Sequence, residues 1–221
     1  MSPTCARSTA PLPKALLSHV SWHPPMPTTP DIPLPLRPTR VHEVCGPGAT
    51  SFAAVICAQS KGHLLWLREG WQGGTLDPAG LSAFCDPARV LIAQTKSQTD
   101  TLAVAEDALK DGAVALVVIE ATRPLDLREG RRLQLAAKAG QSTGLCLIPE
   151  GAGSPATETR WHCAPVFDPA EPTDSTLMRW EITKNKSGTL GAWHVRWNEA
   201  AHRLDVVPPV GERPGPAPTS G

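Results

Sequence analysis

The residues with the clearest chemical pattern form a glycine-rich turn from Gly46 to Ala53, between an apolar run and a helix-like segment. In a phosphate loop of the form G-x-x-x-x-G-K-[S/T], backbone N–H groups wrap the phosphates, the Lys neutralises them and the hydroxyl holds magnesium. Counted from Gly46, this chain has Ser51 at the second glycine, Phe52 at the Lys and Ala53 at the hydroxyl. We therefore predict a degenerate phosphate loop that has lost ordinary ATP hydrolysis. It comprises Gly46, Gly48, Thr50, Ser51, Phe52 and Ala53.

Four arginines follow the fourth apolar run, at positions Arg123, Arg128, Arg131 and Arg132. Arg128 and Arg132 are four residues apart, so they share one side of the expected helix. Such clusters bind DNA phosphates by Coulomb attraction and counterion release. A solvated helix face beside Glu129 explains the same residues, and both interpretations stay open.

Tryptophan and cysteine give structural rather than catalytic signals. Trp161, Trp180, Trp193 and Trp197 could stack on single-stranded bases, but their alternation with polar residues favours a core or an interface. The six cysteines show neither a C-x-x-C pair nor zinc-type spacing, so we expect buried free thiols, a reducing cytoplasm, no metal and no cofactor.

The composition bounds the class of protein. The chain has 221 residues, enough for one α/β domain with tails, and its formal net charge is zero. No global field therefore draws it to nucleic acid or membrane, and any DNA contact must come from a local patch. An apolar run long enough for a membrane helix is absent, and so is the apolar core of a signal peptide, which again favours a cytoplasmic protein.

Apolar runs alternate with helix-like segments along the middle of the chain. Continuous apolar runs are typical of strands covered on both faces, while helical spacing and capping residues predict the helices. The expected strands are 41–45, 63–68, 90–94, 114–119 and 144–148, and the expected helices are 50–59, 77–84, 97–110 and 126–140. This alternation implies right-handed crossovers and a mainly parallel sheet flanked by helices.

Beyond residue 160, polar and apolar residues alternate in the segments 161–166, 177–184, 192–197 and 203–207. We expect one-sided antiparallel strands that extend the sheet. The termini are rich in proline, which lacks an N–H donor. We therefore predict a largely disordered segment at 1–39, a domain at 40–207 and a disordered tail at 208–221. Within the first segment, residues 14–20 are amphipathic and could dock a partner.

The order of these segments resembles the RecA core. An LDP turn at 76–78, the strand in DPARVLIAQ at 86–94, a helix and an apolar run closed by Glu120 succeed one another as in RecA, where that run is the Walker B strand. Lys184-Asn185-Lys186 is similar to the Lys-Asn-Lys turn of RecA. Within this superfamily, RRLQLAA at 131–137 and TRW at 159–161 resemble most the ImuA family.

This resemblance implies a RecA-like fold and an accessory role in the DNA-damage (SOS) response. Its implied partners in error-prone translesion synthesis are an inactive Y-family polymerase homologue and an error-prone replicative-type polymerase, with RecA as a further one and only weak DNA contact. Glu120 takes the Walker B position, and Lys184 and Lys186 take a filament-type interface. Glu69 lies where RecA proteins orient the attacking water. Because the loop departs from the family pattern, we expect no enzyme activity and a solvated Glu69.

Two alternatives remain at the level of sequence. SulA-like inhibitors of cell division share a reduced RecA-like scaffold. A RecA-like ATPase with an irregular phosphate loop would share the whole pattern, and nucleotide binding would distinguish it.

Overall fold

The computed structural model describes residues 31–74, 76–169 and 176–209, so the expectations for 1–30 and 210–221 lie outside it. Its helices are α1 (Ala49–Gln59), α2 (Pro78–Ser82), α3 (Gln98–Asp111) and α4 (Leu127–Ala139), with a 3-10 turn at Pro87–Arg89. Its strands are β1 (Val41–Cys45), β2 (Leu64–Glu69), β3 (Val90–Thr95), β4 (Leu116–Glu120), β5 (Thr143–Leu147), β6 (Thr159–Pro165), β7 (Met178–Asn185), β8 (Gly191–Asn198) and β9 (Arg203–Val207).

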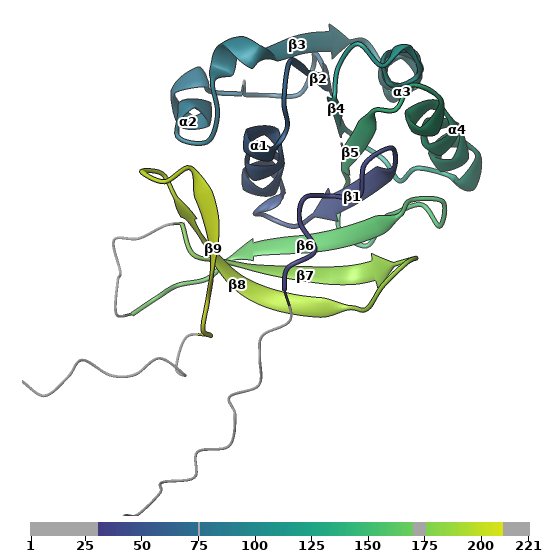
Figure 1. Cartoon of the computed structure of the whole chain (residues 1–221). Coiled ribbons are helices and arrows are strands. Elements are labelled where there is room, and N and C mark those ends of the chain that lie inside the picture. The colour runs from purple at the N-terminus through teal and green to yellow at the C-terminus, as the bar shows by residue number, and fades with distance from the viewer. Residues whose placement is uncertain (1–30, 75, 170–175, 210–221) are drawn as a thin grey trace, which may run out of the picture.

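All nine strands form one sheet in the order β3-β2-β4-β5-β1-β6-β7-β8-β9. The first five pairings, from β3 to β6, are parallel, and the last three, from β6 to β9, are antiparallel. Figure 1 shows α1 inside the curve of the sheet and α3 and α4 outside it. The predicted fold class is confirmed: an α/β sheet, mainly parallel, with helices and C-terminal antiparallel strands.

Local capping chemistry fixes most of the helix ends. The Asp77 and Ser97 side chains accept backbone N–H groups at the starts of α2 and α3. Asp126 and Glu129 form the predicted capping box of α4. Gly112 ends α3 in the left-handed conformation, where a Cβ would lie 2.2 Å from a backbone oxygen. Within the described residues, none of the helices has the length and apolar content needed to cross a membrane.

Two apolar cores lie on the two faces of the sheet. The cluster on one face joins α3 and α4 to the parallel strands, with Leu109, Leu133 and Ile119 fully or almost fully buried. The cluster on the other face joins α1 and α2 to parallel and antiparallel strands together. Trp161, Trp180, Trp193 and Trp197 all belong to it and are at most 6% exposed, as the alternation predicted. These four indoles are therefore core residues and are not available to stack on bases.

The segment 31–39 does not follow the expectation of disorder. Ile32 and Leu34 pack against the second cluster, and Leu36 is buried in it. The Arg37 guanidinium donates to the Glu158 carboxylate at 2.9 Å. Proline prevents this segment from forming a helix or an inner strand, but an extended chain can still bury every second side chain. The ordered domain therefore begins before residue 40.

His42 ties this segment to the sheet. Its Nε2 lies 2.9 Å from the Arg37 carbonyl oxygen, which can only accept, so Nε2 carries the proton. Its Nδ1 then accepts from the Thr159 hydroxyl at 2.6 Å. Burial lowers the pKa of the imidazole to about 4, against 6.5 for a free histidine. The folded chain thus holds His42 neutral, with both ring nitrogens hydrogen-bonded.

This arrangement predicts a fall in stability at mildly acidic pH. Below about pH 6.5 the unfolded chain protonates His42 and the folded chain does not, so the free energy of unfolding falls as pH drops from 6.5 to 4. The full loss is about 3.5 kcal/mol, because the pKa change from 6.5 to about 4 corresponds to about 1.4 kcal/mol per pH unit. Urea unfolding at pH 7 and pH 5 should show about 2 kcal/mol of this loss, because pH 5 lies about 1.5 units below the ordinary pKa of histidine. His42→Asn should flatten the dependence, and equal slopes for variant and wild type would contradict this prediction.

Candidate functional site

A cavity of about 600 Å³ opens at the carboxyl ends of β2, β4 and β5, beside the start of α1. Crevices at this edge of a parallel sheet are the usual ligand sites of α/β folds. Thr50 and Ser51 contribute polar groups from α1, while Arg68 and Glu120 contribute charges from β2 and β4. Apolar side chains line much of the remaining wall, which also includes Gln72 and Asp77; they are Leu76, Leu81, Phe84, Leu147 and Ile148. The cavity therefore gathers only part of the predicted phosphate site.

The glycine turn itself is short and closed. β1 ends at Cys45 and α1 already begins at Ala49. The Gly48 N–H donates to the Cys163 carbonyl at 2.8 Å, and the Ala49 N–H donates to the Gly46 carbonyl at 3.0 Å. Gly46 has φ +91°, and a Cβ there would lie 2.5 Å from the Cys163 oxygen. Two N–H groups that could cradle a phosphate are thus bonded within the protein.

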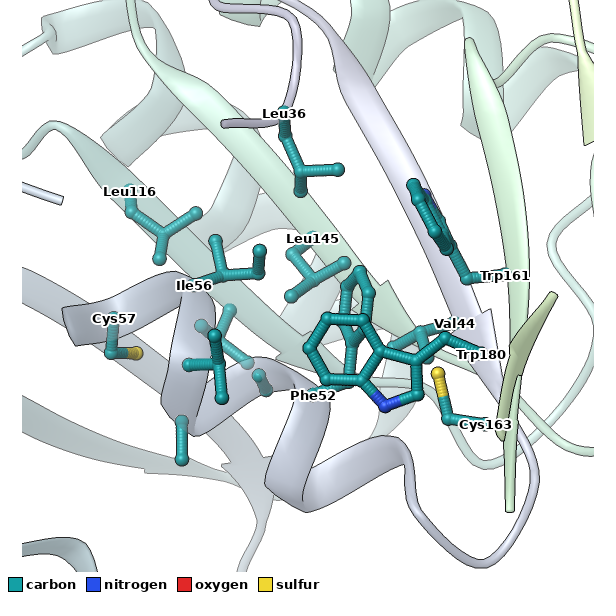
Figure 2. Packing of buried hydrophobic residues seen from close by; sticks show 14 of the residues in the cluster. Leu36, Val44, Phe52, Ile56, Cys57, Leu116, Leu145, Trp161, Cys163 and Trp180 are labelled. Carbon is teal, nitrogen blue, oxygen red and sulfur yellow. The ribbon is translucent and has the colours of Figure 1, made fainter. Parts of the chain in front are cut away.

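Phe52 and Ala53 do not face the cavity. Both are fully buried, and Figure 2 shows the Phe52 ring directed at the indole of Trp180. The centroid of the Phe52 ring lies 4.7 Å from that of Trp180 and 5.2 Å from that of Trp161. The side chain at the Lys position of the motif is therefore part of the apolar core.

Glu120 lies in the cavity wall but is already engaged. Its Oε1 accepts from the Trp66 indole at 2.7 Å, and its Oε2 lies 3.5 Å from the buried Arg68 guanidinium. A neighbouring guanidinium opposes a bound cation by Coulomb repulsion. In the parts of the chain that the structure describes, no group of three His, Cys, Asp or Glu residues is placed to hold a metal ion.

Arg68 contributes a guanidinium group to the cavity wall, and the sequence analysis did not identify it. Its Nη1 donates to the Gly74 carbonyl at 2.8 Å, while its Nε is buried and has no hydrogen-bond partner among the residues that the structure describes. The Gln72 Oε1 is likewise buried and unbonded. A charged residue near the end of the apolar run at 63–68 was the available signal.

The expectation that Glu69 is solvated was wrong. Glu69 is only 4% exposed, and its carboxylate accepts hydrogen bonds from the Trp71 indole at 2.6 Å and from the Thr122 hydroxyl. β2 lies between β3 and β4, so the residues that follow these neighbouring strands cover its end. Glu69 consequently organises the loops after β2 and β4.

The four predicted arginines divide into two kinds. Arg123 pairs with Glu129 at 2.6 Å, and Arg132 pairs with Glu106 at 2.5 Å. Arg128 and Arg131 are exposed on α4, and no ion pair involves them among the described residues. The structure thus places three of the four on one helix, and two of those three form no ion pair within the described part of the chain.

Lys184 and Lys186 both reach the loop before β6. The Lys184 ammonium donates to the carbonyls of Ser154, Pro155 and Thr157 at 2.8–3.0 Å. The Lys186 ammonium donates to the carbonyl of Ala156. Burial lowers the pKa of Lys184, and the nearby positive charge of Lys186 lowers it further. In this chain both ammonium groups stabilise the loop at 154–157.

A buried carboxylate that the sequence analysis did not single out holds the same loop. Glu43 in β1 is fully buried and accepts from the Ser154 N–H, the Thr157 hydroxyl and the Arg160 Nε, all at 2.8–2.9 Å. A glutamate inside the apolar run at 41–45 was the signal for it. Such a carboxylate persists in a core because its charge is paired and its oxygens are hydrogen-bonded.

The described cysteines are free and buried, as the spacing predicted, at positions Cys45, Cys57, Cys85, Cys146 and Cys163. Burial raises the pKa of the Cys57 thiol to about 12. A thiol in this state is a poor nucleophile, so cysteine chemistry does not add to the site.

Comparison with known proteins gives one consistent result. No protein-family model matches the chain. The chain is 30% identical over 188 residues to Protein ImuA from two strains of Caulobacter vibrioides, NA1000 / CB15N and ATCC 19089 / CIP 103742 / CB 15. Each alignment covers 73% of this chain and 76% of the relative.

The position of Phe52 yields a prediction for any attempt to restore the motif. Phe52→Lys should lower the free energy of unfolding by at least about 3 kcal/mol, because it removes ring packing and buries an ammonium among indoles. It should not create ATP binding, measured with a fluorescent ATP analogue. Thr50→Lys, at an exposed position two residues away, is the control and should stay within about 0.5 kcal/mol of wild type. A stable Phe52→Lys protein that binds ATP would refute this interpretation.

Proposed function

The chain belongs to the ImuA family, and from this premise we propose that it is a non-catalytic, RecA-like accessory protein of the DNA-damage response. It supports error-prone translesion synthesis through contacts with other proteins. Its proposed partners are an inactive Y-family polymerase homologue and an error-prone replicative-type polymerase, with RecA as a further one.

The observation that carries the non-catalytic part is the burial of Phe52. The position that holds a phosphate-binding Lys in a working loop is filled by a ring packed against Trp161 and Trp180. Phosphoryl transfer relies on positioned positive charge to stabilise its transition state. Here the nearest cation in the cavity, Arg68, lies beside the carboxylate of Glu120. The cavity walls thus supply little net positive charge for a triphosphate.

Two other groups of residues, the four arginines and the two lysines, bear on which partners the chain could contact. A direct DNA contact through Arg123, Arg128, Arg131 and Arg132 is a minor contribution, because two of the four are paired with glutamates. A filament-type contact through Lys184 and Lys186 would require a partner group to compete with the loop carbonyls that they now hold.

The proposal predicts how the gene behaves after DNA damage. In the bacterium that carries it, deletion should lower the frequency of ultraviolet-induced mutation as much as deletion of the inactive polymerase homologue, and deleting both should lower it no further. Glu120→Gln should restore full mutagenesis, since the amide still accepts from Trp66. The purified wild type should show no magnesium-dependent ATP turnover.

Three results would overturn the proposal in distinct ways. Unchanged mutagenesis after deletion would remove the role in translesion synthesis. ATP turnover that disappears in Glu120→Gln would make the chain an ATPase. Cell filamentation on overexpression, with binding to the tubulin-like division protein, would favour a SulA-like inhibitor.

A further inference from the structure

The outer face of α4 carries two leucines in water. Leu127 is 51% exposed and Leu135 is 68% exposed, although the buried stripe of the helix runs through Leu133, Ala136 and Ala137 on the opposite side. Leu127, Arg131 and Leu135 follow one another at intervals of four residues, so they form a row along the helix. The leucines are about 12 Å apart along the axis, at about 1.5 Å per residue. We call this row, with the flanking Arg128 and Lys138, the α4 outer face.

The charge on this face is of one sign. Arg128, Arg131 and Lys138 are exposed, and no salt bridge among the described residues involves them. The two acids that line the grooves beside this face already have partners. Asp126 caps the helix, and Glu158 is paired with Arg37 and Arg40. A chain of zero net charge thus concentrates uncompensated positive charge beside two exposed leucines.

Two grooves run along the row. One, of about 450 Å³, separates it from the loop at Pro155 and from Lys186, and the other, of about 510 Å³, lies on the Arg128 side. Leu127, Arg131 and Leu135 line both grooves and form the ridge between them. In Figure 1, α4 lies at the outside of the molecule beside α3, and no described segment crosses its outer side.

We propose that the α4 outer face binds an amphipathic helix of a partner protein, one whose apolar row is flanked by Asp and Glu. Helices that dock in grooves use apolar residues at intervals of three and four, which matches the spacing of this row. Acidic residues beside the partner's row would meet the three unpaired cations. A nucleic acid would use those cations for its phosphates, but its backbone would leave both leucines in water.

The chain's own termini do not fit this face. Residues 1–30 contain no Asp or Glu, and residues 210–221 contain one Glu and one Arg. Neither segment has the acidic residues that would complement this face, so the proposed occupant is a helix of a partner protein. The inference deepens the proposed function, since it supplies one contact surface for an accessory protein, but its binding test does not depend on mutagenesis.

The test is a titration of the purified full-length chain against defined fluorescent probes. The first probe is a peptide of about 18 residues, or about five helical turns, with leucines every third or fourth position and glutamate elsewhere. The others are the same peptide with lysine for glutamate, a scrambled acidic peptide, a single-stranded oligonucleotide and a duplex. The acidic helix should bind best. Leu127→Ala/Leu135→Ala and Arg128→Gln/Arg131→Gln should each weaken it about tenfold or more.

A matched control variant distinguishes binding at this face from non-specific binding to any exposed leucine. Leu190→Ala removes a leucine that is 63% exposed on the β7–β8 connection, and it should leave the affinity unchanged. Thermal unfolding should show all variants folded. The proposal is overturned if the acidic helix fails to bind or if Leu190→Ala weakens it equally. It is also overturned if only the oligonucleotides bind, with the arginine variant affected and the leucine variant not. These outcomes leave the mutagenesis result for the proposed function untouched.

Discussion

The packing of Phe52 against Trp161 and Trp180 joins the two halves of this fold. Phe52 lies in the first turns of α1, while the tryptophans come from β6 and β7, the start of the antiparallel extension. The two indole centroids are themselves 6.5 Å apart, edge to face, a preferred aromatic geometry. Because the ring draws α1 onto β6, the Cys163 carbonyl comes close enough to bond the Gly48 N–H. One aromatic contact thus fixes the helix, closes the glycine turn and sets the cavity beside it.

A polar network joins the same strands immediately next to the aromatic cluster, where Glu43 pairs with Arg160 and Val44 with Trp161. Glu43 in β1 accepts hydrogen bonds from the loop at 154–157 and from Arg160. The Lys184 ammonium of β7 donates to carbonyl groups of the same loop. Removing one member would leave a buried charge without its partner, which is the costly way to break such a network. The network therefore specifies how β1, β6 and β7 meet, whereas the aromatic cluster supplies the apolar burial.

Sequence patterns predicted the fold well because the parallel and antiparallel parts of the sheet have different hydrophobic patterns. Continuous apolar runs marked the parallel strands, and strict alternation around Trp180 and Trp193 marked the antiparallel ones. Capping residues such as Asp126 located helix starts. The patterns failed where burial depends on what covers an element. Glu69 is buried by residues after neighbouring strands. Leu36 belongs to a segment whose prolines suggested disorder, yet its side chain is buried in the apolar core. The cavity could not be predicted from the sequence, because Arg68 and Glu120 come together only through the pairing of β2 with β4.

The distribution of charge explains why binding surfaces on this chain must be local. With zero net charge there is no long-range field to hold a polyanion, so affinity must come from patches in which cations lack partners. In the cavity Arg68 faces Glu120, and near β6 the two lysines are bound to carbonyls. On α4, Arg128, Arg131 and Lys138 form no ion pair with any described residue, and leucines lie between them. A surface that combines unpaired charge with exposed apolar area gains more from a protein helix than from phosphates alone, because only the helix also removes the leucines from water.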